Sequence, residues 1–210
     1  PEEFRVLRNL FADRIGVDFG NDMRFALERR LRERLAALNL TSFADYCEYL
    51  RYSPGADAEW EEAIDLCTTN ETYFFREDYQ LRCFTAEVLP QLAREIGPRG
   101  RLSIWSAGCS TGEEVYSIAA AVKESGLFSQ AEIRIFGSGI SRRCVAAARR
   151  GVYTASSFRQ TPPDLRRRYF AERPDGIHVN EDLRAMCNFG QLNLVNPERS
   201  AVVGRVHVIF

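Results

Sequence analysis

A glycine-rich turn is the part of the sequence best suited to hold a ligand; it runs Ser-Ala-Gly-Cys-Ser-Thr-Gly-Glu-Glu over residues 106–114. Gly108 and Gly112 follow an apolar run with the pattern of a buried strand, where glycines let the backbone approach a ligand closely. The helix expected to follow directs its positive N-terminal end to the same place. The spacing is not the G-x-G-x-x-G of dinucleotide-binding folds, and no Gly-Lys-Ser/Thr follows as in a P-loop.

Two glutamates, Glu113 and Glu114, begin the helix after this turn. Their charge suits the helix dipole but would repel a pyrophosphate. A cofactor with a positive charge or an amino group fits better, and S-adenosylmethionine has both a sulfonium and an α-ammonium group. A tight turn followed by a Glu pair that only satisfies the dipole explains the same residues equally well.

A second chemistry-bearing segment precedes the turn at residues 68–77, Thr-Thr-Asn-Glu-Thr-Tyr-Phe-Phe-Arg-Glu. Polar hydrogen-bonding groups alternate here with aromatic side chains, just before the pattern of the chain changes. Taken alone, this segment is explained as a helix-starting linker whose aromatics seal two domains together.

The residues before this segment, from 1 to about 66, are predicted to form helices. A second helix is expected from Ser42 to Tyr52 and a third over residues 57–65, with no strand signal between them. In the helix before these, apolar positions recur at helical spacing on one stripe, which we assign to a core: Leu27, Leu31, Leu35 and Leu38. The pattern predicts a small all-α module.

The leucine-bearing helix also has a basic surface. Residues 24–34 contain five arginines and two glutamates, a local charge of +3. Away from the leucine stripe, the surface carries Arg29, Arg30, Arg32 and Arg34. On pattern alone, a solvated helix face explains them.

From about Leu102 the pattern changes to strands that alternate with helices. Strands are expected at residues 102–106 and 133–136 and helices at 113–124 and 141–150, followed by Gly151 where a helix C-cap belongs. This alternation predicts a parallel α/β sheet.

Residues 168–190 interrupt the alternation. Asp175-Gly176 is a turn signal between two short apolar runs, and Met186–Phe189 is expected to add a third strand to a small antiparallel insertion. The final residues, Val206–Phe210, have the pattern of a buried parallel strand with no helix after it, so we expect the natural protein to continue beyond them.

Composition excludes several classes of protein. The 210 residues are 45% hydrophobic and 27% charged, and a formal net charge of −1 argues against a generally basic nucleic-acid-binding protein. Six cysteines without a C-x-x-C pair, and only two histidines, argue against a metal site and indicate buried, reduced thiols, as in the cytosol. No apolar run approaches the ~20 residues that a membrane helix needs.

Five segments together match a known pattern in order and spacing. They are Thr-Thr-Asn-x-Thr-x-Phe-Phe-Arg-Glu (68–77), Trp-Ser-Ala (105–107), Ser-Thr-Gly-Glu-Glu-x-Tyr-Ser-Ile-Ala (110–119), Ala-Arg-Arg-Gly-Val-Tyr (148–153) and Leu-Asn-Leu (192–194). With them, the chain resembles the CheR-type chemoreceptor glutamate methyltransferases. The resemblance runs from the arginine-rich helix to the last residue.

The resemblance implies an α/β fold with three parts. An all-α N-terminal domain would cover residues 1–66, a linker contributing to the cofactor site 67–77, and a Rossmann-like S-adenosylmethionine-binding methyltransferase domain, C-terminally truncated, 78–210. A β-subdomain would occupy about 168–190. The implied reaction transfers a methyl group from S-adenosylmethionine to glutamates of chemoreceptors, with S-adenosylhomocysteine as product. The partner would be a chemoreceptor's cytoplasmic domain, so we expect a cytoplasmic monomer that meets the membrane only through its receptor.

The resemblance also implies roles for single residues. Arg76 would be the catalytic residue, near the transferred methyl group and the substrate carboxylate. Glu114 would hold the amino-acid end of the cofactor. The residues that would contact the cofactor are Asn70, Thr72, Arg76, Gly108, Glu114, Asn193 and Leu194, the last two in the adenine pocket. The residues that would face the acidic receptor helices are Arg29, Arg30, Arg32 and Arg34.

The sequence departs from the family at Gly139, where the family usually has an acidic residue that binds the ribose hydroxyls. The family's Cys-Arg-Asn segment and the tyrosine near the methyl group are expected after Phe210. Two alternatives therefore stay open. One is a non-catalytic scaffold or signalling module with the same fold, and the other is a methyltransferase of small molecules or other proteins.

Overall fold

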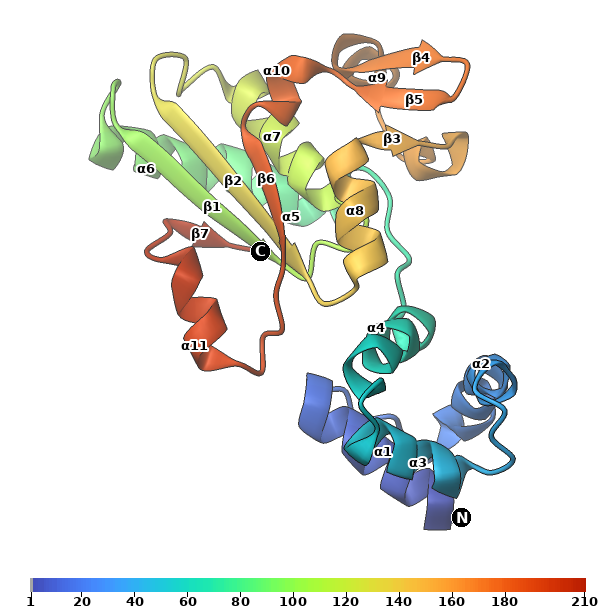
Figure 1. Ribbon diagram of the computed structural model, residues 1–210. Helices are drawn as coiled ribbons and strands as arrows, with labels where there is room; N and C mark the ends of the chain where they lie inside the picture. The colour runs from blue at the N-terminus through green and yellow to red at the C-terminus, as the bar shows by residue number, and fades with distance from the viewer. Residues whose placement is uncertain (1) are drawn as a thin grey trace.

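The computed structural model describes residues 2–210, apart from the side chain of Asn21. Its core consists of two separate clusters of buried side chains. The buried members of one come from residues 4–67 and those of the other from residues 74–183. Segment 68–77 joins the two halves (Figure 1).

The N-terminal half is all helical. Ser42 begins α3 as predicted, because its side-chain oxygen accepts a hydrogen bond of 3.1 Å from the Asp45 amide. Leu27, Leu31 and Leu35 are buried and Leu38 packs against the same cluster, which confirms the leucine stripe. The elements are α1 (Glu2–Ile15), a 3₁₀ turn (Asn21–Met23), α2 (Arg24–Ala37), α3 (Phe43–Tyr52) and α4 (Ala56–Cys67).

The C-terminal half contains a four-stranded parallel sheet in the order β6-β2-β1-β7. Its elements in chain order are α5 (Asp78–Cys83), a π-helical turn (Phe84–Val88), α6 (Leu89–Ile96), β1 (Arg101–Ala107), α7 (Glu113–Ser125), β2 (Glu132–Gly139), α8 (Arg142–Arg150), β6 (Cys187–Gln191), α11 (Pro197–Ser200), a 3₁₀ turn (Ala201–Val203) and β7 (Val208–Ile209).

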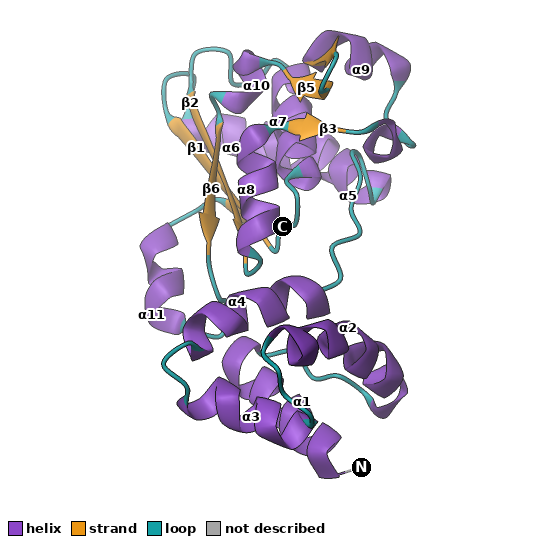
Figure 2. Ribbon diagram, turned by 45° about the vertical axis from the view of Figure 1, so that its right-hand side comes forward, coloured by secondary structure: helices purple, strands orange, loops and turns teal. Residues whose placement is uncertain are grey.

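Helices α6, α7 and α8 lie together on one side of this sheet (Figure 2). Strand β1 pairs with β2 along its whole length, with Ile104 opposite Ile135, and both side chains are buried. Gly151 ends α8 with a left-handed φ of 62°. The predicted alternation of strands and helices is therefore confirmed, and with it the α/β fold class.

A second, antiparallel sheet of three strands has the order β3-β5-β4. Its hairpin is the predicted one, but the expectation for Met186–Phe189 is wrong. That run lies mainly in β6, which pairs in parallel with β2 of the main sheet, and the third strand is β3 instead. The elements of this β-subdomain are β3 (Val152–Tyr153), a 3₁₀ turn (Ala155–Phe158), α9 (Pro163–Tyr169), β4 (Phe170–Arg173) and β5 (Gly176–Val179), followed by α10 (Glu181–Arg184).

The two halves meet through α4 and the start of α8. Asp65 accepts a hydrogen bond from the Ser141 hydroxyl, and its carbonyl accepts one of 3.1 Å from Arg143. Gln191, at the end of β6, donates to the Glu61 carboxylate at 2.8 Å. The helical half therefore faces the end of the sheet at which β2 and β6 terminate.

The cysteines agree with the prediction only in part. All six are free thiols, and Cys47, Cys67, Cys109 and Cys144 are buried, but Cys83 is exposed and Cys187 is partly exposed. Among residues 2–210, no helix is both long and apolar enough to cross a membrane.

Candidate active site

Two cavities lie at the carboxyl end of the parallel strands, where α/β sheets bind their ligands. The first, of about 510 Å³, lies between the linker, α5, the glycine-rich turn and the start of α7. Its lining residues are Thr69, Glu71, Thr72, Tyr73, Arg76, Glu77, Tyr79, Gln80, Leu81, Gly108, Cys109, Ser110, Glu114, Ser117 and Phe210. The second, of about 600 Å³, lies between the two halves and is lined among others by Trp60, Glu61, Ile140, Gln191 and Asn193.

The glycine-rich turn has a strongly curved backbone. Gly108 and Gly112 have φ of 111° and 95°, and Ser110 between them has φ of 47°. The amides of Gly108 and Cys109 donate to the Ser138 carbonyl at 2.9 and 2.7 Å, which fixes the turn on the end of β2. An added Cβ at Gly108 would meet nothing within 4 Å, so this backbone is open toward the first cavity.

The two glutamates after the turn have different surroundings. Glu113 is buried and accepts hydrogen bonds from Thr111 at 2.6 Å and from Ser157 at 3.0 Å, so it ties the turn to the β-subdomain. Glu114 lines the first cavity, and the buried Ser106 hydroxyl donates to its carboxylate at 2.7 Å. Of these two glutamates, Glu114 is therefore the one that lines the cavity.

The linker is anchored by two phenylalanines. Phe74 is fully buried among Tyr153, Phe158 and Phe170 of the β-subdomain, with ring centroids 4.7–4.9 Å away. Its amide donates to the Ser157 carbonyl at 2.9 Å. The prediction that these aromatics seal the two domains together is therefore wrong for Phe74, because its ring packs in the β-subdomain and not against the helical half.

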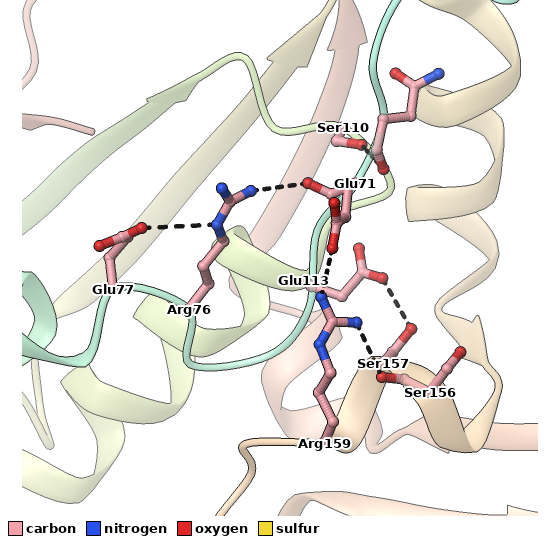
Figure 3. Close-up of polar contacts among 9 residues, drawn as sticks. Glu71, Arg76, Glu77, Ser110, Glu113, Ser156, Ser157 and Arg159 are labelled. Atoms are coloured by element: carbon pink, nitrogen blue, oxygen red, sulfur yellow. Dashed lines mark hydrogen bonds and ion pairs between the residues drawn. The ribbon is translucent and has the colours of Figure 1, made fainter.

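Arg76 follows the second of these phenylalanines and faces the first cavity. The amide of Phe75 donates to Ser117 of α7 at 2.9 Å. Phe75 and Glu77 both have left-handed backbones, with φ of 58° and 55°, a strained arrangement for non-glycine residues that is typical of functional sites. The Arg76 side chain is 49% exposed, and its Nη1 donates to the Glu71 carbonyl at 2.9 Å (Figure 3).

The remaining linker residues of the prediction lie beside the same cavity. Thr72 lines it. Asn70 does not, but its carbonyl accepts a hydrogen bond of 3.2 Å from Ser110 of the turn. Cys109 lines the cavity too, and burial, together with the charge of Glu114, raises the pKa of its thiol to about 12. The thiol therefore stays protonated at neutral pH and is not a nucleophile.

Gly139 ends β2 between the two cavities. An added Cβ would lie 3.9 Å from the Cys109 sulfur and from the Ser110 amide nitrogen, and the next residue, Ile140, lines the second cavity. The nearest atom to such a Cβ would be Cγ2 of Val145 at 3.6 Å, which is an ordinary contact. The backbone at Gly139 also lies outside the left-handed region, so the position has room for a side chain.

Asn193 and Leu194, the two residues assigned to the adenine pocket, do not lie in the same cavity. Asn193 lines the second cavity and donates to the Arg14 carbonyl of α1 at 2.7 Å. Leu194 lines neither cavity and is 51% exposed, so the structure does not place it with the other predicted cofactor residues.

The four arginines of α2 that were predicted to face a receptor differ in their surroundings. Arg29 and Arg32 are exposed, whereas Arg30 donates to the Cys67 carbonyl at 3.2 Å, at the start of the linker. Arg34 forms two hydrogen bonds, of 3.0 and 2.6 Å, with Glu59, which is 3% exposed and also accepts from the Tyr46 hydroxyl at 2.7 Å. The expectation that Arg34 faces a receptor is therefore corrected, because its guanidinium neutralises a buried carboxylate within the helical half.

This difference predicts different effects on stability. Replacing Arg34 by alanine leaves the Glu59 carboxylate buried without its cation, and we expect the free energy of unfolding to fall by about 2–3 kcal/mol. Replacing the exposed Arg29 on the same helix should change it by less than about 0.5 kcal/mol. Urea unfolding of both variants measures the difference, and equal losses would contradict the structural role of Arg34.

Three polar residues of this region were given no role by sequence reasoning, although two of them, Ser106 and Ser117, lie within the family motifs. Ser106 and Ser117 orient Glu114 and Phe75, yet serines in these positions are common in any strand or helix. Arg159 contacts the linker from the β-subdomain, 88 residues away in the sequence. Only the fold brings these groups together.

Comparison of this chain with models of known protein families shows to which family it belongs. Residues 2–68 match the model described as "CheR methyltransferase, all-alpha domain", and residues 70–210 match "CheR methyltransferase, SAM binding domain". The chain belongs to the CheR methyltransferase family. S-adenosylmethionine is therefore the cofactor of this CheR-family chain. The residues present fit it, because the first cavity combines the open backbone at Gly108 with the Glu114 carboxylate, which suits an ammonium group.

Relatives support the same family. The chain is 34% identical to chemotaxis protein methyltransferase 2 of Vibrio cholerae over 99% of this chain and 72% of that protein. It is also 34% identical to chemotaxis protein methyltransferase 2 of Pseudomonas aeruginosa, over 100% of this chain and 73% of the relative. The chemotaxis protein methyltransferase of Escherichia coli is 33% identical over 99% of this chain and 71% of its own length.

Proposed function

We propose that this CheR-family protein transfers a methyl group from S-adenosylmethionine to glutamate side chains in the cytoplasmic domain of chemoreceptors. The observation that carries the proposal is that Arg76 and Glu114 line one cavity, so that a cation for a substrate carboxylate and an anion for the cofactor's ammonium group face the same space. The three relatives named above are all chemotaxis protein methyltransferases, which supports the chemotactic role.

The cofactor would extend across both cavities. Glu114 would hold its amino-acid end beside Gly108 and Thr72, with Asn70 fixing the turn, and Asn193 would contact the adenine in the second cavity. Gly139 lies between the two ends, where the ribose would pass. Leu194 would reach this site only if residues after β6 moved.

The methyl transfer requires mainly that the protein position the cofactor and the substrate carboxylate. When bound, S-adenosylmethionine supplies an activated methyl group that a carboxylate oxygen can attack in a single displacement. A glutamate is already ionised near neutral pH, so no general base is required. Arg76 would orient the carboxylate by charge-assisted hydrogen bonds, and the backbone strain on both sides would hold its direction.

The receptor would meet the exposed arginines of α2. Arg29 and Arg32 face solvent, and Arg30 brings the helix to the first residues of the linker. A basic helix face next to the linker suits the acidic helices of a receptor. We assign residues 1–66 to this recognition role, 67–77 to the link with the cofactor site and 78–210 to methyl transfer, and we propose that the protein acts in the cytoplasm as a monomer.

A second candidate function is a non-catalytic signalling module. It is favoured by Gly139, since the ribose would find no carboxylate at the end of β2. Such a module would keep both cavities but bind the cofactor weakly.

The proposal is tested by incubating the protein with methyl-labelled S-adenosylmethionine and membranes that contain the organism's chemoreceptors. We expect label in the receptor band that mild base releases as methanol, because glutamate methyl esters hydrolyse easily. Receptors whose cytoplasmic glutamates are replaced by alanine serve as the control. Base-stable label, or label on the control receptor, would contradict glutamate methylation.

A further inference from the structure

Arg159 connects the β-subdomain to the linker that carries Arg76. It follows the 3₁₀ turn Ala155–Phe158, and its Nη2 lies 3.0 Å from Oε1 of Glu71 (Figure 3). Its guanidinium carbon is also 3.7 Å from the ring centroid of Tyr73, a stacked cation–π contact. Both partners belong to the linker and line the first cavity, whereas Arg159 itself lines neither cavity.

Glu71 has contacts to both arginines. Its carboxylate pairs with Arg159, and its main-chain carbonyl accepts the 2.9 Å hydrogen bond from Arg76. Tyr73 also contacts both arginines: Arg159 stacks on its ring, and the guanidinium carbon of Arg76 lies 5.8 Å from the centroid of the same ring. Glu71 and Tyr73 of the linker thus each contact Arg159 of the β-subdomain on one side and Arg76 of the cavity on the other.

Arg76 needs such support because its own contacts are few. Its side chain is half exposed, and in the part of the chain described its contacts are the Glu71 carbonyl, a 3.7 Å ion pair with Glu77 and the Tyr73 ring at 5.8 Å. A long, exposed side chain loses its direction easily, as the rotamer entropy of arginine favours many conformations. The 42% exposed Arg159, in contrast, follows directly on Phe158, which stacks on the buried Phe74.

We infer that Arg159 is a positioning residue for methyl transfer, which acts through Glu71 and Tyr73 to hold the Arg76 guanidinium toward the substrate carboxylate. The inference rests on the proposed function, because it assumes that Arg76 meets the carboxylate. It assigns to the β-subdomain a direct part in the geometry of the reaction, in addition to any part in binding the receptor.

The first test is kinetic. Replacing Arg159 by alanine should lower kcat about 10-fold, since small misplacements of an orienting group cost up to ~100-fold in rate. The KM for receptor and the Kd for S-adenosylhomocysteine should stay within about twofold, because Arg159 lines neither cavity. Arg159→Lys, which keeps the cation near Glu71, should recover part of the loss.

Two further variants locate the effect. Glu71→Gln removes the carboxylate that pairs with Arg159 and keeps the main-chain carbonyl that accepts from Arg76. It should therefore lower kcat as Arg159→Ala does, and the double variant should be no slower than either single one.

Arg166→Ala is the matched control: Arg166 pairs with Glu172 at 2.8 Å and lies over the Phe158 ring at 5.2 Å, but these contacts stay within the β-subdomain. It should leave kcat unchanged. If Arg159→Ala does not fold, Glu71→Gln gives the test alone, because its side chain is 75% exposed.

The second test does not depend on activity. We expect the Nε–H resonance of Arg76 in nuclear magnetic resonance spectra to be resolved in the wild type and in Arg166→Ala, and lost or averaged in Arg159→Ala and Glu71→Gln. An active wild type whose kcat and Arg76 resonance are unchanged by Arg159→Ala overturns the inference. An inactive wild type whose Arg76 resonance still depends on Arg159 supports the positioning and overturns the proposed function instead.

Discussion

Replacing Arg76 by alanine is expected to lower kcat for receptor methylation at least 100-fold. Removal of one preorganised donor from a reacting group typically costs about 10²–10³ in rate. The loss should appear in kcat more than in the Kd for S-adenosylhomocysteine, since the turn and the Glu114 carboxylate, which we propose to hold the ammonium group, are untouched. Single-turnover methyl transfer to receptor membranes, with calorimetric titration of S-adenosylhomocysteine, separates the two quantities.

The fold should survive this change. Arg76 is half exposed, and the chain around it is held by Phe74 and Phe75, so the melting temperature should move by no more than about 2 °C. Arg76→Lys is the matched variant, because it keeps the charge but cannot pair with both oxygens of a carboxylate. It should recover only a small part of the rate. Unchanged turnover in Arg76→Ala would remove Arg76 from the reaction.

Replacing Gly139 by aspartate is expected to raise the affinity for S-adenosylhomocysteine by about 10- to 100-fold. A hydrogen bond to a charged group contributes about 1.5–3 kcal/mol, and each 1.4 kcal/mol is tenfold in Kd. The structure accepts the new side chain, because a Cβ at this position would meet no atom closer than 3.6 Å. It would stand at the end of β2 next to Ser110, between the two cavities.

The matched variant is Gly139→Asn, which has the same size without the charge. It should gain clearly less affinity than the aspartate. If both substitutions weaken binding, the space beside Gly139 serves the ligand as it is, and the ribose does not pass where we place it. The same titration distinguishes the two candidate functions: measurable binding by the unchanged protein favours the enzyme, whereas binding only after Gly139→Asp favours the signalling module.

Local patterns predicted those parts of the fold that depend on neighbouring residues. The strand and helix around the glycine-rich turn, the Ser42 cap and the Gly151 cap were all predictable, because each depends on residues within one or two turns of chain. The strand at residues 187–191 was predictable as a strand but not in its partner. A short apolar run is compatible with either sheet, and only the packing of α8 beneath β2 decides between them.

The candidate site shows the same limit. Glu113 and Glu114 are equivalent by sequence, but they differ by ~100° around α7, so one carboxylate meets Thr111 and Ser157 while the other faces the cavity. Arg34, unlike Arg29, is paired with Glu59, 25 residues later in the chain. A contact between distant residues carries no periodicity of its own, so the sequence left both distinctions open.

The burial of Phe74 in the β-subdomain has a consequence for how the protein is divided. The segment that carries Arg76 is covalently a tether between two halves, but its buried anchor and its amide hydrogen bond belong to the second half alone. Such a segment should fold and unfold as one cooperative unit with the β-subdomain, independently of the helices before Thr68. The helical half is then free to diverge without disturbing Arg76 wherever it does not line the second cavity, as Trp60 and Glu61 do, or contact the second half, as Asp65 does.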